Sequence, residues 1–267
     1  MPAMPADVGQ GSGRWLERWR QATEEFAAGD PGRSVLLQGH GATVGVAADT
    51  PRPGASVLKL FIAIAAHLAG AAGQLDLAAT AAITDLPDSR WPSVLTALHP
   101  DHRFTMAELA GLMMATGDNR IAEHLATTLG FDAVNRVACE VGCRSTRVAI
   151  GFADPALGPA GRANVTTAAD CAIALHAVWT RPALAPLRTA MRSSLFNSRI
   201  LALLPDDVVV AHKTGTLSGV VNDIGVIHAS TGDFTACFLT DAQHDPAATA
   251  QAIARCALAA HDGWQAR

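Results

Sequence analysis

The sequence predicts a mixed α/β fold in which both ends of the chain build one sheet and an all-helical segment is inserted between them. Three observations support this prediction. Strand-like runs occur near both ends, helical periodicity fills the middle, and a helix is expected at each end. With 267 residues, 49% of them hydrophobic, the chain can bury a large core as one domain or as two closely packed subdomains.

The N-terminal elements follow from apolar spacing and turn residues. Residues 14–28 show helical periodicity, because two tryptophans and a phenylalanine recur among charged and polar side chains. Short apolar runs at 34–38 and 42–48 predict two strands around a glycine-rich turn. Proline and glycine residues then break the chain after residue 50.

The middle of the chain is expected to be helical and the C-terminal part to return to the sheet. Helical spacing of apolar residues predicts helices at 56–71, 105–115, 119–129, 131–141, 166–178 and 184–195. Residues 149–163 are rich in glycine and proline and predict a loop. Strands are expected at 208–212, 223–228 and 234–240, followed by a closing helix at 247–261. The sheet subdomain would comprise 13–50 and 196–267, and the helical subdomain 51–195.

Composition and charge exclude several kinds of partner. The net charge of −4 is small for this length and no long basic stripe is present, so we expect no nucleic-acid partner. No apolar run is long and unbroken enough for a membrane span, and the first residues lack the apolar core of a secretory signal. We therefore expect a cytoplasmic protein without membrane contact. The five scattered cysteines favour neither disulfides nor a metal site, and no glycine loop that would cradle phosphates is present, so we expect no cofactor. The expected partner is a small-molecule substrate. The oligomeric state is not predicted.

Two residues at the start of one predicted helix carry the strongest chemical signal, Ser56 and Lys59. Residues three apart share a helix face, so the hydroxyl and the amine would lie within hydrogen-bond reach. A serine becomes a nucleophile when a neighbouring base takes its proton, and a buried lysine with a lowered pKa is such a base. Lys59 and Lys213 are the only lysines of the chain, and lysine, unlike arginine, can lose its proton. Taken alone, the pair also fits a capping serine beside a solvated lysine.

The segment from Lys213 to Thr216 follows a strand-like apolar run. In a strand that ends at a cleft, Lys213 would supply positive charge and Gly215 would let a substrate approach. The backbone N–H of Thr216 could complete an oxyanion hole. An ordinary strand end followed by a turn is the alternative.

The segment Gly117-Asp118-Asn119 lies between two predicted helices. Asp118 would cap the second helix, and Asn119 would offer its amide to a substrate carbonyl. A plain turn between two helices is the alternative reading of this segment.

The three motifs in this order, S-x-x-K, x-D-N and K-T-G, resemble the signature set of class A β-lactamases and penicillin-binding proteins. The similarity extends into the flanking sequence, over residues 52–77, 104–130 and 208–229. The resemblance implies an antiparallel sheet flanked by N- and C-terminal helices, with an all-helical subdomain beside it. It also implies an acyl-enzyme mechanism.

The resemblance implies a role for each motif residue. Ser56 would be the acylated nucleophile and Lys59 its base. The backbone N–H groups of Ser56 and Thr216 would form the oxyanion hole. Asn119 would orient the amide on the acyl side of the substrate.

A second group of residues is expected to recognise the substrate. By the same resemblance, Lys213, Thr214 and Thr216 would bind a carboxylate or a similar anion. Arg199 lies fourteen residues before Lys213, where some related enzymes place a carboxylate-binding arginine, although a surface arginine is an alternative. Trp91 would form an aromatic wall beside the cleft or pack in the core.

The chain departs from the family pattern at two positions. Gly117 replaces the serine that relays a proton to the leaving nitrogen. The glutamate that the family uses for deacylation has no glutamate counterpart in 147–163. One way of aligning this segment with the family places Gly151 or Phe152 at the position of the glutamate. Another places Asp154 there, with Gly158 at the position of the family's accompanying asparagine. Asp154 is also readily explained as a turn residue before a proline.

These departures predict a serine hydrolase that acts on a small ester, amide or lactam and hydrolyses β-lactams poorly. Three alternatives remain open. The chain could be an acyltransferase or amide-forming enzyme with the same nucleophile. It could be a true class A β-lactamase that uses Asp154, or a non-catalytic binder of β-lactams or peptides.

Overall fold

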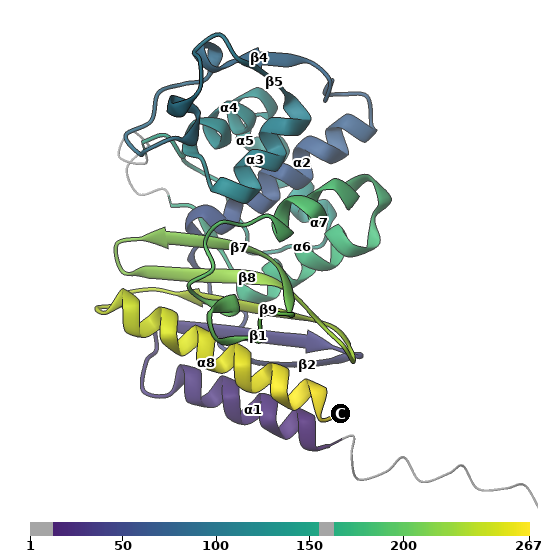
Figure 1. The fold of residues 1–267 in the computed structure, drawn as a ribbon, viewed down its shortest axis with the longest axis vertical. Helices are drawn as coiled ribbons and strands as arrows, with labels where there is room; N and C mark the ends of the chain where they lie inside the picture. Colours follow the sequence, from purple (N-terminus) through teal and green to yellow (C-terminus); the bar gives the residue numbers. More distant parts are fainter. Residues whose placement is uncertain (1–12, 155–162) are drawn as a thin grey trace, which may run out of the picture.

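The structure is a computed structural model that describes residues 13–154 and 163–267. One part of the molecule is a five-stranded antiparallel sheet covered on one face by the first and last helices, and the other part is mostly helical (Figure 1). The sheet has the strand order β2-β1-β9-β8-β7. Its strands are β1 (Arg33–Gly39), β2 (Ala42–Val46), β7 (Val209–Leu217), β8 (Val220–Ala229) and β9 (Gly232–Thr240).

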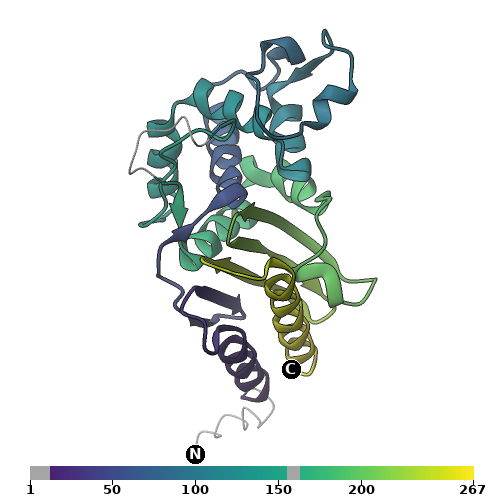
Figure 2. The same cartoon turned by 90° about the vertical axis from the view of Figure 1, so that its left-hand side faces the viewer.

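Both ends of the chain therefore contribute to the sheet, as the sequence predicts. The two terminal helices are α1 (Arg14–Ala27) and α8 (Pro246–Gln265). They lie side by side at the same end of the molecule (Figure 2), where Trp15 of α1 packs edge-to-face on Trp264 of α8 at 5.1 Å. The antiparallel sheet with flanking helices that the family resemblance implies is confirmed.

Alternating side chains connect the sheet to two separate cores. In β1, Val35 and Leu37 point into the core beneath α1 and α8, whereas Leu36 points into the core of the helical part. Both faces of the central strands are thus buried. This explains why β8 is buried without interruption from Val220 to Ile227, including its polar residues Asn222 and Asp223.

The helical part is built around α2 (Lys59–Ala71), which is buried from Lys59 to His67. A helix that is apolar on all sides must be enclosed by other elements. The surrounding helices are α3 (Met106–Thr116), α4 (Asn119–Leu129), α5 (Phe131–Glu140), α6 (Ala168–Thr180) and α7 (Ala185–Arg192). Short 3₁₀ turns are found at Ala55–Leu58, Ile83–Asp85, Val94–Ala97, Pro182–Leu184 and Ile200–Leu203.

The structure corrects the expectation that 51–195 is entirely helical. Two small antiparallel pairs of strands lie in this segment: β3 (Arg52–Pro53) with β6 (Val165–Thr166), and β4 (Thr80–Ala82) with β5 (Arg103–Thr105). Such two- and three-residue strands are too short to show the alternation that identifies a strand in sequence. The predicted helix at 166–178 also begins later, because Thr166 belongs to β6 and Thr167 caps α6.

Among the described residues, no helix combines the length and the apolar character needed to cross a membrane.

Candidate active site

Ser56 lies where the chain passes from the sheet into α2. The helix expected from residue 56 begins instead as the 3₁₀ turn Ala55–Leu58, and α2 starts at Lys59. In a 3₁₀ turn, residues i and i+3 are almost eclipsed, which brings the two side chains together. Lys59 Nζ lies 3.1 Å from Ser56 Oγ, so the structure brings together the pair singled out in the sequence.

The backbone next to Ser56 is held in an unusual conformation. Ala55 has φ 47°, in the left-handed region that costs a non-glycine residue about 1–2 kcal/mol. Strand β7 passes directly against this turn: a Cβ at Gly215 would lie 3.1 Å from Ser56 N. A side chain here would crowd this turn, and glycine leaves room for β7 to lie beside the backbone N–H of Ser56. The oxyanion hole expected from Ser56 and Thr216 remains a prediction.

The surroundings of Lys59 suit a neutral amine. The side chain is fully buried, and its Nζ lies 2.5 Å from Gly117 O and 2.6 Å from Asn119 Oδ1. Burial lowers the pKa of Lys59 well below its ordinary value, the charge of Lys213 lowers it further, and Asp118 opposes the change. A neutral amine can donate two hydrogen bonds to these oxygens and accept the proton of the Ser56 hydroxyl with its lone pair.

The turn that presents Asn119 is fixed by a left-handed glycine and a helix cap. Gly117 ends α3 with φ 70°, a conformation that glycine adopts without strain. The Asp118 carboxylate then accepts hydrogen bonds from Arg120 N and Ile121 N, so the predicted cap is confirmed. As a result, Asn119 is the first residue of α4 and points its amide at Lys59.

The second lysine lies inside a strand rather than at its end. Strand β7 runs through the K-T-G motif to Leu217, which corrects the predicted end near residue 212. Lys213 is buried, and its Nζ donates to Thr214 O at 3.0 Å. Burial lowers the pKa of Lys213 from 10.5 to about 8; Asp223 opposes this and Arg199 adds to it. The motif therefore supplies a cation deep in the wall of the site.

Arg199 is buried, so the alternative of a surface arginine is wrong. Its guanidinium donates to Thr216 Oγ1 at 2.5 Å, to Gly215 O at 3.1 Å and to Asn222 O. These contacts place a second cation beside the end of the K-T-G motif. Together with Lys213, it makes this side of the site suitable for an anionic group of a substrate.

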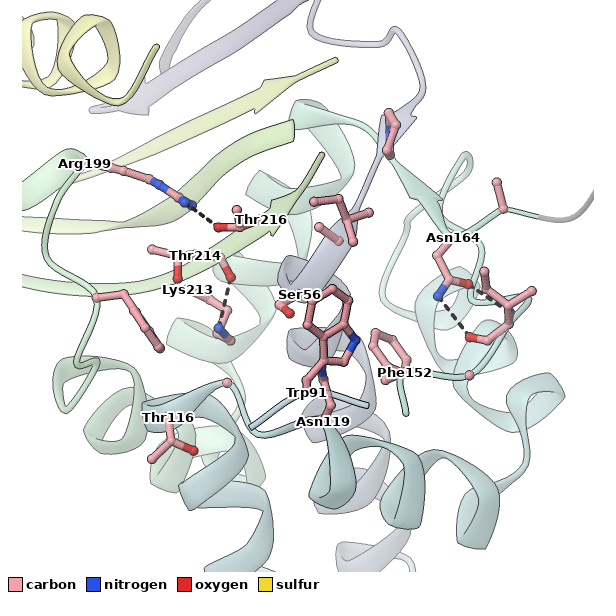
Figure 3. A pocket seen from close by; sticks show the side chains of 18 of the residues that line it. Ser56, Trp91, Thr116, Asn119, Phe152, Asn164, Arg199, Lys213, Thr214 and Thr216 are labelled. Atoms are coloured by element: carbon pink, nitrogen blue, oxygen red, sulfur yellow. Dashed lines mark hydrogen bonds between the residues drawn. The ribbon is translucent and has the colours of Figure 1, made fainter. Parts of the chain in front are cut away.

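These residues surround a cavity of about 500 Å³ (Figure 3). Ser56 lies at its centre, with Lys213, Thr214, Thr216 and Arg199 on one side and Phe152 and Asn164 on the other. Trp91 lines the opening and is 42% exposed, so it is not a core residue. The described lining residues are Pro53, Ala55, Ser56, Trp91, Thr116, Gly117, Asn119, Ile150, Gly151, Phe152, Ala163, Asn164, Phe196, Ser198, Arg199, Lys213, Thr214, Thr216 and Leu217. None of the described lining residues is acidic.

Phe152 occupies the side of the cavity where one sequence match expects the family's glutamate. Its ring centre lies 5.7 Å from Lys59 Nζ, and the ring is buried. Glu123, on α4, accepts hydrogen bonds from Phe152 N at 2.5 Å and Ala153 N at 3.1 Å. The Glu123 carboxylate therefore binds loop backbone, and Glu123 is not among the described lining residues of the cavity.

Asn164 anchors the same loop from the other side, and the sequence analysis missed it. Its Oδ1 accepts from Ala149 N at 2.7 Å and Ile150 N at 3.0 Å, and its Nδ2 donates to Ile150 O at 2.9 Å. Asn164 directly follows the segment 147–163, which contains no asparagine. Glu123 was missed as well; its only sequence signal is its position four residues after Asn119 on one helix face.

Asp154 does not line the cavity. Its Oδ1 lies 3.4 Å from Arg90 Nη1, and Asp154 is not among the described lining residues. Gly158, the partner position in the match that would give Asp154 a catalytic role, lies outside the described residues. Thr116 lines the cavity, but its hydroxyl donates to Leu112 O at 2.7 Å within α3.

Fold and site together define the class of β-lactamase-like serine proteins. The chain matches the beta-lactamase enzyme family over residues 17–264, and it belongs to that family. No curated protein matches the chain in a comparison by sequence.

Solved structures agree with this assignment. A β-lactamase from Sphaerobacter thermophilus is 25% identical, with a TM-score of 0.82, and the match covers 92% of this chain and 98% of that one. The penicillin-binding protein PBP-A is 23% identical, with a TM-score of 0.81 and coverage of 94% and 97%. A mutant of PBP-A, 22% identical with a TM-score of 0.78 and coverage of 94% and 97%, was solved as an acyl-enzyme complex with penicillin G. At these lower identities the likeness shows the fold.

Proposed function

We propose that this chain is a serine hydrolase that forms an acyl-enzyme on Ser56 with a small ester, amide or lactam and deacylates β-lactams slowly. The observation that carries the proposal is the 3.1 Å contact between Ser56 Oγ and the buried amine of Lys59. In acylation, Oγ bonds to the substrate's carbonyl carbon and its proton passes to Lys59 Nζ. The bond from that carbon to the leaving group then breaks.

The wall formed by Phe152 supports slow deacylation of β-lactams. An acyl-enzyme is released when a base removes a proton from an attacking water. No described lining residue is a carboxylate, and an aromatic ring faces Lys59 instead. We therefore assign water activation to neither Glu123, which binds loop backbone, nor Asp154, which lies beside Arg90. The penicillin G complex of the PBP-A mutant shows that this fold can hold an acyl group.

Intact-protein mass spectrometry tests the proposal. The protein is mixed with a chromogenic β-lactam or with a chromogenic short-chain ester, and adduct mass and released chromophore are followed together. We expect a long-lived β-lactam adduct on wild type, faster turnover of the ester, and neither signal in Ser56→Ala. Ser193→Ala is the matched control, because Ser193 is exposed and its hydroxyl bonds to Thr189 O within α7.

Two results would contradict the proposal. If ester turnover persists in Ser56→Ala, Ser56 is not the nucleophile. If hydrolysed β-lactam is released rapidly without a detectable adduct, deacylation is not slow and the protein is a working β-lactamase. Adding amines to the ester reaction separates hydrolysis from transfer, because an acyltransferase would yield the amide of the added amine.

A further inference from the structure

Gly117 flanks the reacting pair without contributing a side chain. Its carbonyl oxygen lies 2.5 Å from Lys59 Nζ, so the residue is adjacent to the nucleophile and its base. A Cβ at this position would lie 3.4 Å from Lys213 Nζ and 3.7 Å from the Phe196 ring. The space beside the pair is therefore bounded by a cation and an aromatic ring, and position 117 offers no hydroxyl to it.

Two neighbouring hydroxyls already donate to other partners. The Thr116 hydroxyl donates to Leu112 O at 2.7 Å. The Ser93 hydroxyl donates to Asp118 Oδ2 at 2.5 Å. The hydroxyls of Ser198, Thr214 and Thr216 also line the cavity, but none of them is on Gly117, the residue beside the reacting pair.

Once Lys59 has taken the serine proton, each N–H of its ammonium group already has a nearby acceptor. An ammonium group has three N–H donors. The three oxygens around Nζ, Ser56 Oγ, Gly117 O and Asn119 Oδ1, match these donors one for one. The proton taken from the serine therefore stays directed at Oγ and is not aimed at the atom that departs.

This arrangement discriminates between leaving groups. A nitrogen leaving group departs only when it receives a proton, so amide cleavage needs a positioned acid. Phenols and thiols have pKa values of about 10 and about 8.5, so they can depart as anions. The ammonium of Lys213 would stabilise such an anion, and the ring of Phe196, which is half exposed, offers an apolar surface to an aromatic group.

We propose that the substrate is an ester or thioester whose leaving group departs as a stabilised anion, with an aromatic or similarly apolar group carried on the leaving oxygen or sulfur. This inference rests on the proposed acyl-enzyme at Ser56. The Oγ–carbon bond forms, the carbon–oxygen or carbon–sulfur bond breaks, and the electron pair leaves with the oxygen or sulfur. The serine proton remains on Lys59 until it passes to solvent. Water then converts the acyl-serine to a carboxylic acid and restores the hydroxyl.

A leaving-group series tests the inference. Acylation rates are measured for esters of one acyl group with phenols of graded acidity, for the corresponding aryl thioester and for the matched anilide. In wild type we expect the rate to fall steeply as the phenol pKa rises, and the anilide to acylate more slowly than its reaction with hydroxide would predict. Gly117→Ser should flatten the dependence and raise anilide acylation about 10²–10⁴-fold over Gly117→Ala. The alanine variant is the matched control, because it carries the same backbone strain and the same Cβ.

Each remaining result has a definite meaning. Wild-type rates that are independent of the leaving group overturn the inference. Efficient anilide acylation by wild type also overturns it, whether the proton comes from a lining hydroxyl or from the Lys213 ammonium, because the site would then hold an acid for nitrogen. Loss of that activity in Thr214→Val or Ser198→Ala would identify a hydroxyl as the donor. If the Gly117 variants do not fold, the wild-type series still decides the question. Absence of any Ser56 adduct would overturn the proposed function, whereas an adduct with a flat leaving-group dependence overturns this inference alone.

Discussion

Replacing Lys213 with methionine should abolish acylation and stabilise the protein. The ammonium group is buried, and burial lowers the pKa of Lys213 from 10.5 to about 8 even though Asp223 opposes this effect. A lowering of this size means that holding the charge in the folded protein at pH 7 costs about 3 kcal/mol. Methionine removes that cost and keeps an unbranched side chain in the same space.

The expected gain is smaller than this cost because one hydrogen bond is lost. The donation from Lys213 Nζ to Thr214 O, at 3.0 Å, contributes about 1 kcal/mol. The net stabilisation is therefore about 2 kcal/mol at pH 7. For a chain of this size, that corresponds to a rise in Tm of roughly 4–8 °C.

The pH dependence of the gain is the decisive measurement. Below pH 8 the lysine is charged in both folded and unfolded chains, so its full cost is present. Between pH 8 and 10.5 the folded protein releases the proton first, and above 10.5 the lysine is neutral in both states. The advantage of Lys213→Met should thus be largest at pH 7 and vanish near pH 10.5.

Urea unfolding of wild type and Lys213→Met from pH 7 to 10.5 measures this difference. Lys213→Arg is the control, because it keeps a charge that cannot be released in this range and should show no such gain. A variant that is less stable than wild type at pH 7, or one whose advantage persists at pH 10.5, would refute the reasoning.

Three further outcomes are expected. The acylation rate should rise with pH as Lys59 loses its proton and should fall above about pH 8 as Lys213 loses its charge. In Lys213→Arg the decrease above pH 8 should disappear. An acylation rate that does not change with pH would contradict the roles of Lys59 as base and Lys213 as cation. Phe152→Glu should shorten the lifetime of a β-lactam adduct, measured by mass spectrometry, because it places a carboxylate on the wall that faces Lys59. Phe152→Gln is the control, because its side chain is not a base. Equal adduct lifetimes in the two variants would exclude this wall as the site of water activation. Asn164→Ala should lower stability by about 1–3 kcal/mol in urea unfolding, because Ala149 N and Ile150 N lose their acceptor; a change near zero would show that the loop is held by other contacts.

Features that depend on neighbouring residues in the sequence were predictable. Ser56 and Lys59 lie three positions apart, so any helical turn brings them together, and the structure does so with a 3₁₀ turn. The Asp118 cap is also local, because its carboxylate accepts hydrogen bonds from the backbone N–H groups two and three residues later in the chain. For the same reason, most helix and strand positions were predicted to within a few residues.

Features that depend on the folded loop were not predictable. Asn164 binds backbone fourteen and fifteen residues away, and Glu123 binds backbone about thirty residues away. Neither contact involves a partner side chain, so no pair of residue types in the sequence marks it. The burial of Arg199 was missed for a related reason: its main partners are carbonyl oxygens of β7 and β8, which every residue type provides.

The proposed mechanism gives the two lysines complementary roles, which would account for burying both amines in one site at a cost in stability. The base must be neutral and the anion-binding group must be charged, so one side chain type has to exist in two protonation states side by side. Asp223 raises the pKa of Lys213 and keeps its charge accessible, while that charge lowers the pKa of Lys59. In the proposed mechanism, the charge of Lys213 therefore helps to keep Lys59 neutral, so that it can act as the base. Any acylation that survives in Lys213→Met should accordingly require a higher pH than in wild type, because Lys59 would then hold its proton more tightly.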